Sequence, residues 1–190
     1  MYLANKLRMV PAVALTVLFI GTLAPAAFGG TAQQNEARRL QISNQLIDFK
    51  RTAAEMRHEA HTLKSFTPYK NLHWQSHTNR LDVLKNQVNE LGKTLAELEA
   101  MMPIASENQS LAIEHARPHL VSVAENLTKA IELVREDRSS VRWMEYADAV
   151  SSISVHADEL HDKVDAILDY EDARMRLDNL ELQPSSTQGS

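Results

Sequence analysis

The sequence contains no cysteine. Disulfide bonds, covalent attachment of c-type haem and lipid attachment to a thiol are therefore excluded. Without such cross-links, the stability of the folded chain has to come from a packed apolar core. A chain of 190 residues is long enough to form one.

Glycine, proline and aromatic residues are also scarce, with 5 glycines, 6 prolines and 5% aromatics. The sequence has no glycine-rich loop of the kind that holds phosphate groups, and no alternating run typical of β-strands. It also shows no nucleophile motif or paired carboxylates. We therefore predict no enzymatic activity and name no catalytic residue.

The one long hydrophobic run lies at the N-terminus. Lys6 and Arg8 precede the apolar stretch Met9–Ala24, and small residues follow it. This stretch of about 16 residues is shorter than the roughly 20 that a membrane-spanning helix needs. Residues 1–30 match a secretory signal peptide, with cleavage near Ala26–Gly30, and predict a periplasmic or secreted protein. The alternative is an uncleaved anchor, the only membrane contact that the sequence predicts.

Positive charge is in short supply in the rest of the chain. Removing the leader takes away Lys6 and Arg8, which leaves 18 basic residues (20 − 2) against 25 acidic ones, a net charge of −7 with neutral histidines. Such a chain has no electrostatic attraction to nucleic acid or anionic lipid. We therefore predict no nucleic-acid partner.

The rest of the chain contains apolar residues in alternating steps of three and four, which place side chains along one face of an α-helix. The clearest stripe is in segment 74–102, at Trp74, His77, Leu81, Leu84, Val88, Leu91, Leu95, Leu98 and Met102. Three other segments have similar stripes. Segment 36–65 has Ile42, Leu46, Phe49, Ala53, Met56, Ala60 and Leu63, and segment 106–136 has Ile113, Ala116, Leu120, Val123, Leu127, Ala130 and Val134. Segment 140–180 has Tyr146, Ala149, Ile153, Ala157, Leu160, Val164 and Ile167.

Four amphipathic helices with short connections predict an all-α fold, an antiparallel four-helix bundle over residues 31–182. Residues 183–190 have the composition of a disordered tail. Ser106 and Gln109 have the spacing of a capping box before the third helix. Pro118 inside that helix predicts a kink, because proline cannot donate the helical hydrogen bond; a break there is the alternative.

The second helix leaves two questions open. It begins either with Thr67 as its cap and Pro68 in its first turn, or nearer Asn71. Gly92 costs about 1 kcal/mol relative to alanine inside a helix. It either permits the close approach of a neighbouring helix or has no special role.

Several short motifs together resemble a family of exported, all-helical bacterial proteins with no known activity. The resemblance rests on Trp74-Gln75-Ser76-His77, Leu81, Asn89, Gly92, Pro118-His119-Leu120, Glu125-Asn126 and Asp169-Tyr170. It covers most of the chain after the leader. It implies an all-helical fold and implies no activity.

Eight histidines follow the leader, and their positions on a helical wheel separate them. Only His73 and His77, with Trp74 between them, can point into the bundle together. They predict a low-affinity zinc or copper site near one end, completed by His119 or His156. The alternative is that His77 is a core histidine bonded to a polar neighbour. The remaining histidines fall beside or opposite the stripes and are predicted to lie at the surface.

Two other metal or cofactor sites are weaker. A di-iron bundle needs two inward Glu-x-x-His motifs, and the single match, from Glu55 to His58, faces away from its stripe. Non-covalent haem held by His77 with Met56 or Met102 is the remaining alternative.

The main prediction is an exported bundle of binding or structural type, without a cofactor, whose partner is another protein or a second copy of itself. The alternative function is metal binding through His73 and His77.

Overall fold

The structure is a computed structural model that describes residues 32–69 and 71–181. The predicted leader, residues 1–30, and the predicted tail, residues 183–190, lie outside the described residues. Within the described part there are four long helices, two short 3-10 helices and no strand, which confirms the all-α four-helix bundle. The elements are α1 (Ala32–Phe66), α2 (Trp74–Ala100), η1 (Met102–Ile104), α3 (Glu107–Glu136), η2 (Arg138–Arg142) and α4 (Met144–Glu181).

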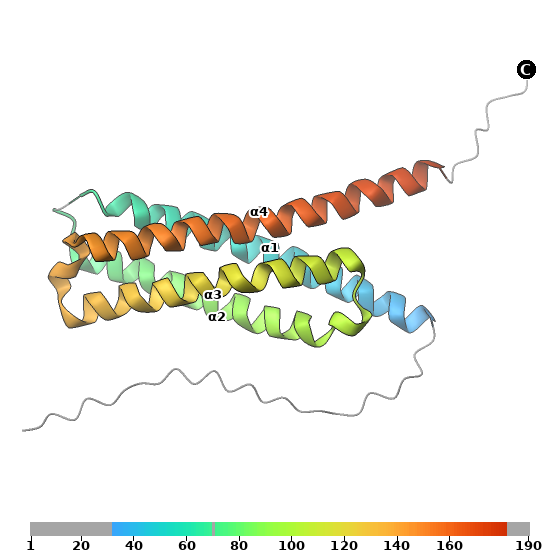
Figure 1. Ribbon diagram of the computed structural model, residues 1–190, viewed down its shortest axis with the longest axis horizontal. Coiled ribbons are helices and arrows are strands. Elements are labelled where there is room, and N and C mark those ends of the chain that lie inside the picture. Colours follow the sequence, from blue (N-terminus) through green and yellow to red (C-terminus); the bar gives the residue numbers. More distant parts are fainter. Residues whose placement is uncertain (1–31, 70, 182–190) are drawn as a thin grey trace, which may run out of the picture. The chain divides into compact units, whose positions relative to one another are not determined.

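Bonds between helices show how the four helices are arranged. Along α1 and α4 they follow in opposite order, so these helices run in opposite directions: Lys50–Asp165, Arg57–Asp162 and His61–Asp158. The same reversal relates α1 to α2 and α3 to α4: Gln45–Glu97 with Glu59–Arg80, and His119–Glu159 with Lys129–Glu145. Both α1 and α3 contact α2 and α4 along their lengths, so α1 and α3 stand on a diagonal of the bundle (Figure 1).

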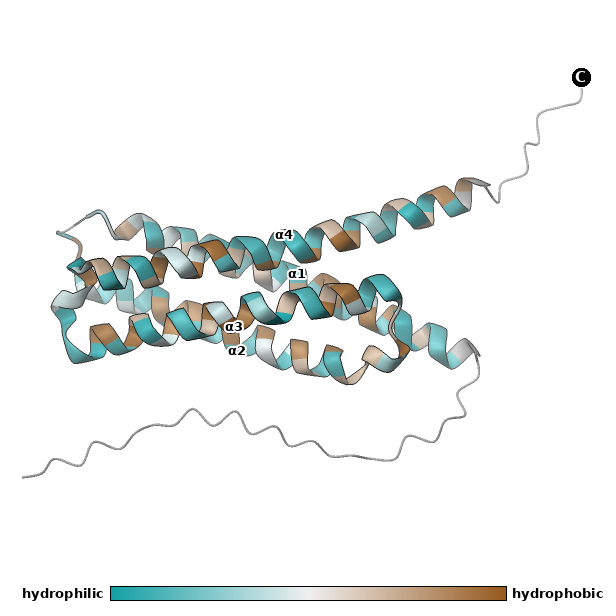
Figure 2. Ribbon diagram, in the orientation of Figure 1, coloured by the Kyte–Doolittle hydropathy of each residue, from teal (hydrophilic) through white to brown (hydrophobic). Residues whose placement is uncertain are grey.

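The predicted stripes form the core. Every stripe position of α1 and α3 is buried, as is every position of α2 from His77 to Leu98, while Trp74 and Met102 are half-buried. Figure 2 shows the apolar residues in bands along the helices. On α4 every stripe position from Tyr146 to Val164 is buried, Ile167 is half-buried against the core, and its neighbour Leu168 is buried. A helix with 3.6 residues per turn drifts against a strict heptad, so the fourth residue after Val164 faces the core.

The connections settle part of what the sequence left open. Thr67 does not cap α2; its hydroxyl donates to the carbonyl of Lys64 and so ends α1, while His73 precedes the first turn of α2. The capping box is confirmed, because Ser106 Oγ accepts from Gln109 N and Gln109 Oε1 accepts from Ser106 N. Helix α3 continues through Pro118, and the kink expected there stays a prediction.

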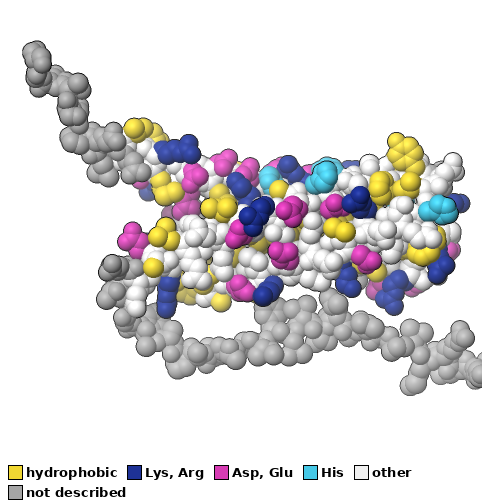
Figure 3. All heavy atoms as spheres, turned by 180° about the vertical axis from the view of Figure 1, so that it is seen from behind, with side chains coloured by type: hydrophobic (Ala, Val, Ile, Leu, Met, Phe, Trp, Pro, Cys, Tyr) yellow, Lys and Arg dark blue, Asp and Glu magenta, His cyan; other side chains and the backbone are white. Residues whose placement is uncertain are grey.

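Two surface features complete the fold. A Cβ atom added at Gly92 would have no neighbour within 4 Å, so Gly92 does not serve close packing. The face in Figure 3 carries acidic and basic side chains interspersed over the bundle. In the described part of the chain, no helix combines the length and apolar character that crossing a membrane requires.

Candidate metal centre

His77, one of the two predicted ligands, lies in the core. Its side chain is buried, and its Nδ1 is 3.0 Å from the Tyr146 hydroxyl. The Phe66 and Tyr146 rings pack edge-on against it. If the Tyr146 hydroxyl donates, Nδ1 accepts and the proton of a neutral imidazole sits on Nε2. Burial lowers the pKa of His77 and raises the pKa of Tyr146, because each loses the water that would stabilise its charged form.

His73, the other predicted ligand, lies in different surroundings. It is exposed, immediately before α2, and lines a surface pocket together with Arg138 and Arg142. Two guanidinium groups raise the electrostatic cost of placing a metal cation beside it. The structure therefore leaves His73 at the surface and gives His77 a tyrosine partner. The site made of His73 and His77 stays a prediction that the geometry does not favour.

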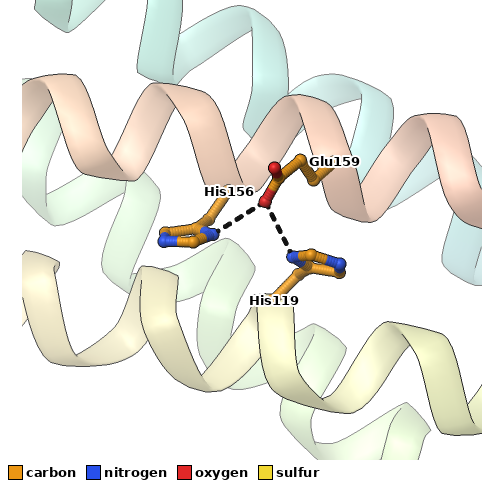
Figure 4. A group of neighbouring side chains, drawn as sticks. All are labelled: His119, His156 and Glu159. Carbon is orange, nitrogen blue, oxygen red and sulfur yellow. Dashed lines mark hydrogen bonds and ion pairs between the residues drawn. The ribbon is translucent and has the colours of Figure 1, made fainter.

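The structure brings three other side chains together, and we call them the His–Glu cluster: His119, His156 and Glu159 (Figure 4). The Nδ1 atoms of His119 and His156 both lie 3.0 Å from the same Oε2 atom of Glu159. One potential ligand atom from each residue falls in a group whose members are all within 4.8 Å of one another. This is the one group of three or more potential ligands in residues 32–69 and 71–181.

Two helices position the His–Glu cluster. His156 and Glu159 are three residues apart on α4, so they project from adjacent turns of one face. His119 reaches them from α3, one residue after Pro118. The stripes beside the cluster carry the buried alanines Ala116 on α3 and Ala157 on α4. The imidazole centroids of His119 and His156 are 5.9 Å apart.

The geometry of the His–Glu cluster suits a divalent transition-metal ion. Metal–ligand bonds of 2.0–2.2 Å in a tetrahedron place neighbouring ligand atoms about 3.3–3.6 Å apart. Each imidazole nitrogen lies 3.0 Å from the carboxylate oxygen, so the ligand atoms would separate by a few tenths of an ångström around an ion. Two imidazoles and one carboxylate form a known three-ligand set for zinc, which leaves a fourth position for water. Imidazole ligands also suit copper and nickel.

The same three side chains also satisfy one another without an ion. Glu159 Oε2 can accept a hydrogen bond from the Nδ1–H of each histidine. For a metal to bind at Nδ1, each imidazole has to carry its proton on Nε2, which frees the Nδ1 lone pair. The cluster is partly screened from water, since the side chains of His119, His156 and Glu159 are 20%, 32% and 45% exposed. An ion there would remain within reach of solvent.

A second group of three polar side chains contains a serine, a histidine and an aspartate, the residue types of a hydrolase triad. His61 Nδ1 is 3.3 Å from Ser154 Oγ, and His61 Nε2 is 2.8 Å from Asp158 Oδ1. In a hydrolase, such a serine has to meet a substrate. Ser154 is fully buried between α1 and α4. The trio therefore links two helices and does not form a catalytic site.

Sequence reasoning named His119 and His156 only as additions to the first pair, and did not name Glu159. The wheel placed both histidines beside their stripes, where side chains leave the core but still reach a neighbouring helix. The signal that could have found the cluster is the i, i+3 spacing of His156 and Glu159 combined with the register of α3 on α4. That register is a tertiary property, and the spacing alone is common.

Comparisons with other proteins add no further assignment. No family model, no curated protein and no solved structure matches the chain. The resemblance to exported helical proteins stays a prediction from the motifs. The pattern of residues 1–30 and the geometry of the bundle remain as the indications of function.

Proposed function

We propose that this protein is an exported helical bundle that binds one divalent transition-metal ion, zinc or copper, between α3 and α4. The observation that carries this proposal is the convergence of His119, His156 and Glu159 from two helices within ligand distance of one another. Residues 1–30 supply the argument for export, because their pattern is that of a signal peptide.

The proposed chemistry is binding without catalysis. Three protein ligands hold an ion more tightly than the two predicted from His73 and His77, because each added ligand contributes without a further loss of the ion's translational freedom. Copper(II) is expected to bind more tightly than zinc, following the general order for nitrogen and oxygen ligands. Binding should weaken at acidic pH, because protons compete with the ion for imidazole nitrogens.

Calorimetric titration of the purified protein with zinc and with copper tests the site. We expect saturable binding of one ion per chain, lost when His119→Ala and His156→Ala are combined. The matched control combines His58→Ala and His115→Ala, two exposed histidines on α1 and α3 that lie outside the cluster. Circular dichroism of both double variants checks that the helices persist.

The titration also separates this site from the one predicted from sequence. Binding that survives loss of His119 and His156 would contradict the proposal. Binding that is lost in His73→Ala would assign the ion to the end of the bundle where α2 begins. The Glu159→Gln variant sharpens the assignment, because its amide oxygen keeps the shape of the carboxylate but is a poorer ligand for zinc.

A second candidate function, self-association, is favoured by the end of α4. Ser106 at the start of α3 bonds Glu171 on α4, so α4 beyond Glu171 extends past the start of α3 (Figure 1). From Tyr170 onward, α4 exposes apolar residues in heptad spacing, at Tyr170, Ala173, Leu177 and Leu180. A stripe of this kind is typical of helices that pair with another helix.

The proposed partner of this stripe is the α4 end of a second copy. In a parallel pair, Asp169 precedes the stripe of one copy and faces Arg174 of the other, an opposite-charge contact at the usual flanking positions. Sedimentation equilibrium should show a dimer that Leu177→Glu/Leu180→Glu dissociates. Val121→Glu, at an exposed position on α3, is the control. A monomer at all concentrations would contradict self-association.

A further inference from the structure

The opposite end of the bundle carries a surface pocket of about 270 Å³, formed where the segment before α2 meets η2. Leu72, His73 and Trp74 line one side, and Arg138, Val141 and Arg142 line the other. His156 is ten residues from Tyr146, or about 15 Å along α4. Since Tyr146 bonds His77 near the start of α2, the pocket is well separated from the His–Glu cluster.

The charge of the pocket is opposite to that of the chain. The whole protein has a net charge of −5, yet this pocket is lined by two arginines and a histidine and by no carboxylate. Within the described residues, neither Arg138 nor Arg142 forms a salt bridge. The neighbouring Asp137 carboxylate is engaged in its own turn, where it accepts bonds from the backbone N and Oγ of Ser139.

One of the two cations is held in place. The guanidinium carbon of Arg138 lies 4.4 Å from the centroid of the Trp74 ring, a cation–π contact. Trp74 is half-buried and packs against the core, so it provides a firm base for the arginine. A guanidinium positioned in advance loses less conformational freedom when it binds an anion, and its planar donors match the oxygens of a carboxylate or a phosphate.

We propose that this pocket binds a small organic anion through Arg138 and Arg142. Its carboxylate or phosphate group accepts hydrogen bonds from the two guanidinium groups, and its apolar part lies against Leu72 and Val141. A volume of about 270 Å³ suits a compact molecule. This site is independent of the metal site and places a cationic pocket at one end of an acidic bundle.

Fluorescence titration of the full protein tests the pocket, with Trp143→Phe as the background so that Trp74 is the only reporter. The probes are benzoate, inorganic phosphate and the neutral analogue benzyl alcohol, at constant ionic strength because salt screens exposed charges. We expect a saturable change with an oxyanion and none with benzyl alcohol. Tighter binding of benzoate would identify an apolar carboxylate as the ligand class, and tighter binding of phosphate would identify a phosphate group.

Variants locate the binding. Arg138→Gln and Arg142→Gln should each weaken it about tenfold, since each removes a charged hydrogen bond. The control pair Arg38→Gln/Arg176→Gln removes two charges from exposed positions elsewhere on the bundle and should leave the affinity unchanged. Equal affinity in the Arg138→Gln/Arg142→Gln variant, an equal loss in the control, or no saturable response to either anion would overturn the proposal.

Discussion

Histidine occupies two contrasting places in this bundle. His77 is enclosed in the core and bonded to a neutral hydroxyl, whereas His119 and His156 lie between two helices at the surface and share a carboxylate. Helical position explains the difference. A position in a stripe is shielded from water, which favours a neutral imidazole with a single hydrogen bond. A position beside the stripe stays accessible to solvent, so it can accommodate a charged group and a third ligand.

In this bundle the inward-facing histidine has a single core partner, whereas the group of potential metal ligands lies beside the stripes. The core contributes stability, and burial there favours a polar side chain that has a fixed partner, as His77 has in Tyr146. The boundary between α3 and α4 combines partial screening with access to solvent, which are the conditions that the proposed metal site requires. Four predictions test how different the interior and the outer surface are, beginning with the largest expected effect.

The largest effect is expected from removing apolar volume in the interior. Leu91 lies in the middle of the α2 stripe and is buried, so Leu91→Ala should destabilise the protein by about 2–5 kcal/mol through lost burial and a cavity. Lys93→Ala, on the exposed side of the same helix, should stay within about 0.5 kcal/mol. Urea denaturation measures both, and similar values would erase the distinction between interior and surface.

A smaller effect is expected for the polar pair in the interior. Tyr146→Phe keeps the ring but leaves His77 Nδ1 without its partner, which should cost about 1–3 kcal/mol of unfolding free energy. The matching change at the His–Glu cluster, Glu159→Gln, should cost less than about 1 kcal/mol, because its partners remain accessible to water. A larger loss at Glu159 than at Tyr146 in the same denaturation assay would reverse the comparison.

The pH dependence of stability should follow His77. Its folded pKa is lowered from 6.5, so below that pH the unfolded chain binds more protons than the folded one. Stability is fully present above the unfolded pKa and falls as the pH drops toward the folded pKa, by at most about 1.4 kcal/mol per pH unit. Melting temperatures at pH 7.5 and 5.5 should differ less in His77→Leu than in the wild type; an unchanged difference would exclude His77 as the cause.

The smallest effect is expected at Gly92, where substitution should stabilise. A Cβ there meets no atom within 4 Å, and the residue lies inside α2, so Gly92→Ala should add about 0.4–1 kcal/mol by restricting the unfolded chain. A rise in melting temperature with unchanged metal binding is the expected readout. Destabilisation would mean that another helix or a partner molecule approaches the chain closely at Gly92.

Much of the fold could be predicted because the apolar residues recur with the period of an α-helix. The stripes of α1 and α3 are buried at every predicted position, and the Ser106–Gln109 capping box forms as its spacing indicates. The start of α2 could not be predicted, because Thr67 has two competing uses for its hydroxyl. Local preference favoured Thr67 as the cap of α2, whereas in the structure its hydroxyl bonds the Lys64 carbonyl at the end of α1.

The candidate site was less predictable for a physical reason. The burial of His77 follows from its position in a stripe, but its partner Tyr146 is 69 residues away and depends on how α4 lies against α2. In the sequence, Glu159 resembles any other exposed acid. It becomes part of the His–Glu cluster because α3 places His119 beside it. Sequence spacing reports which face of one helix a residue occupies, and a ligand set also requires the register between two helices.

The pairing of the first and last helices has a consequence for how fast the chain folds. Contacts such as Lys50–Asp165 join residues 115 positions apart, whereas α1 with α2 and α3 with α4 associate as hairpins of near neighbours. Local hairpins close early, while the search that brings the two chain ends together carries the larger loop-closure entropy. We therefore expect the docking of α1 onto α4 to come late in folding, so that substitutions between these two helices change the unfolding rate more than the folding rate.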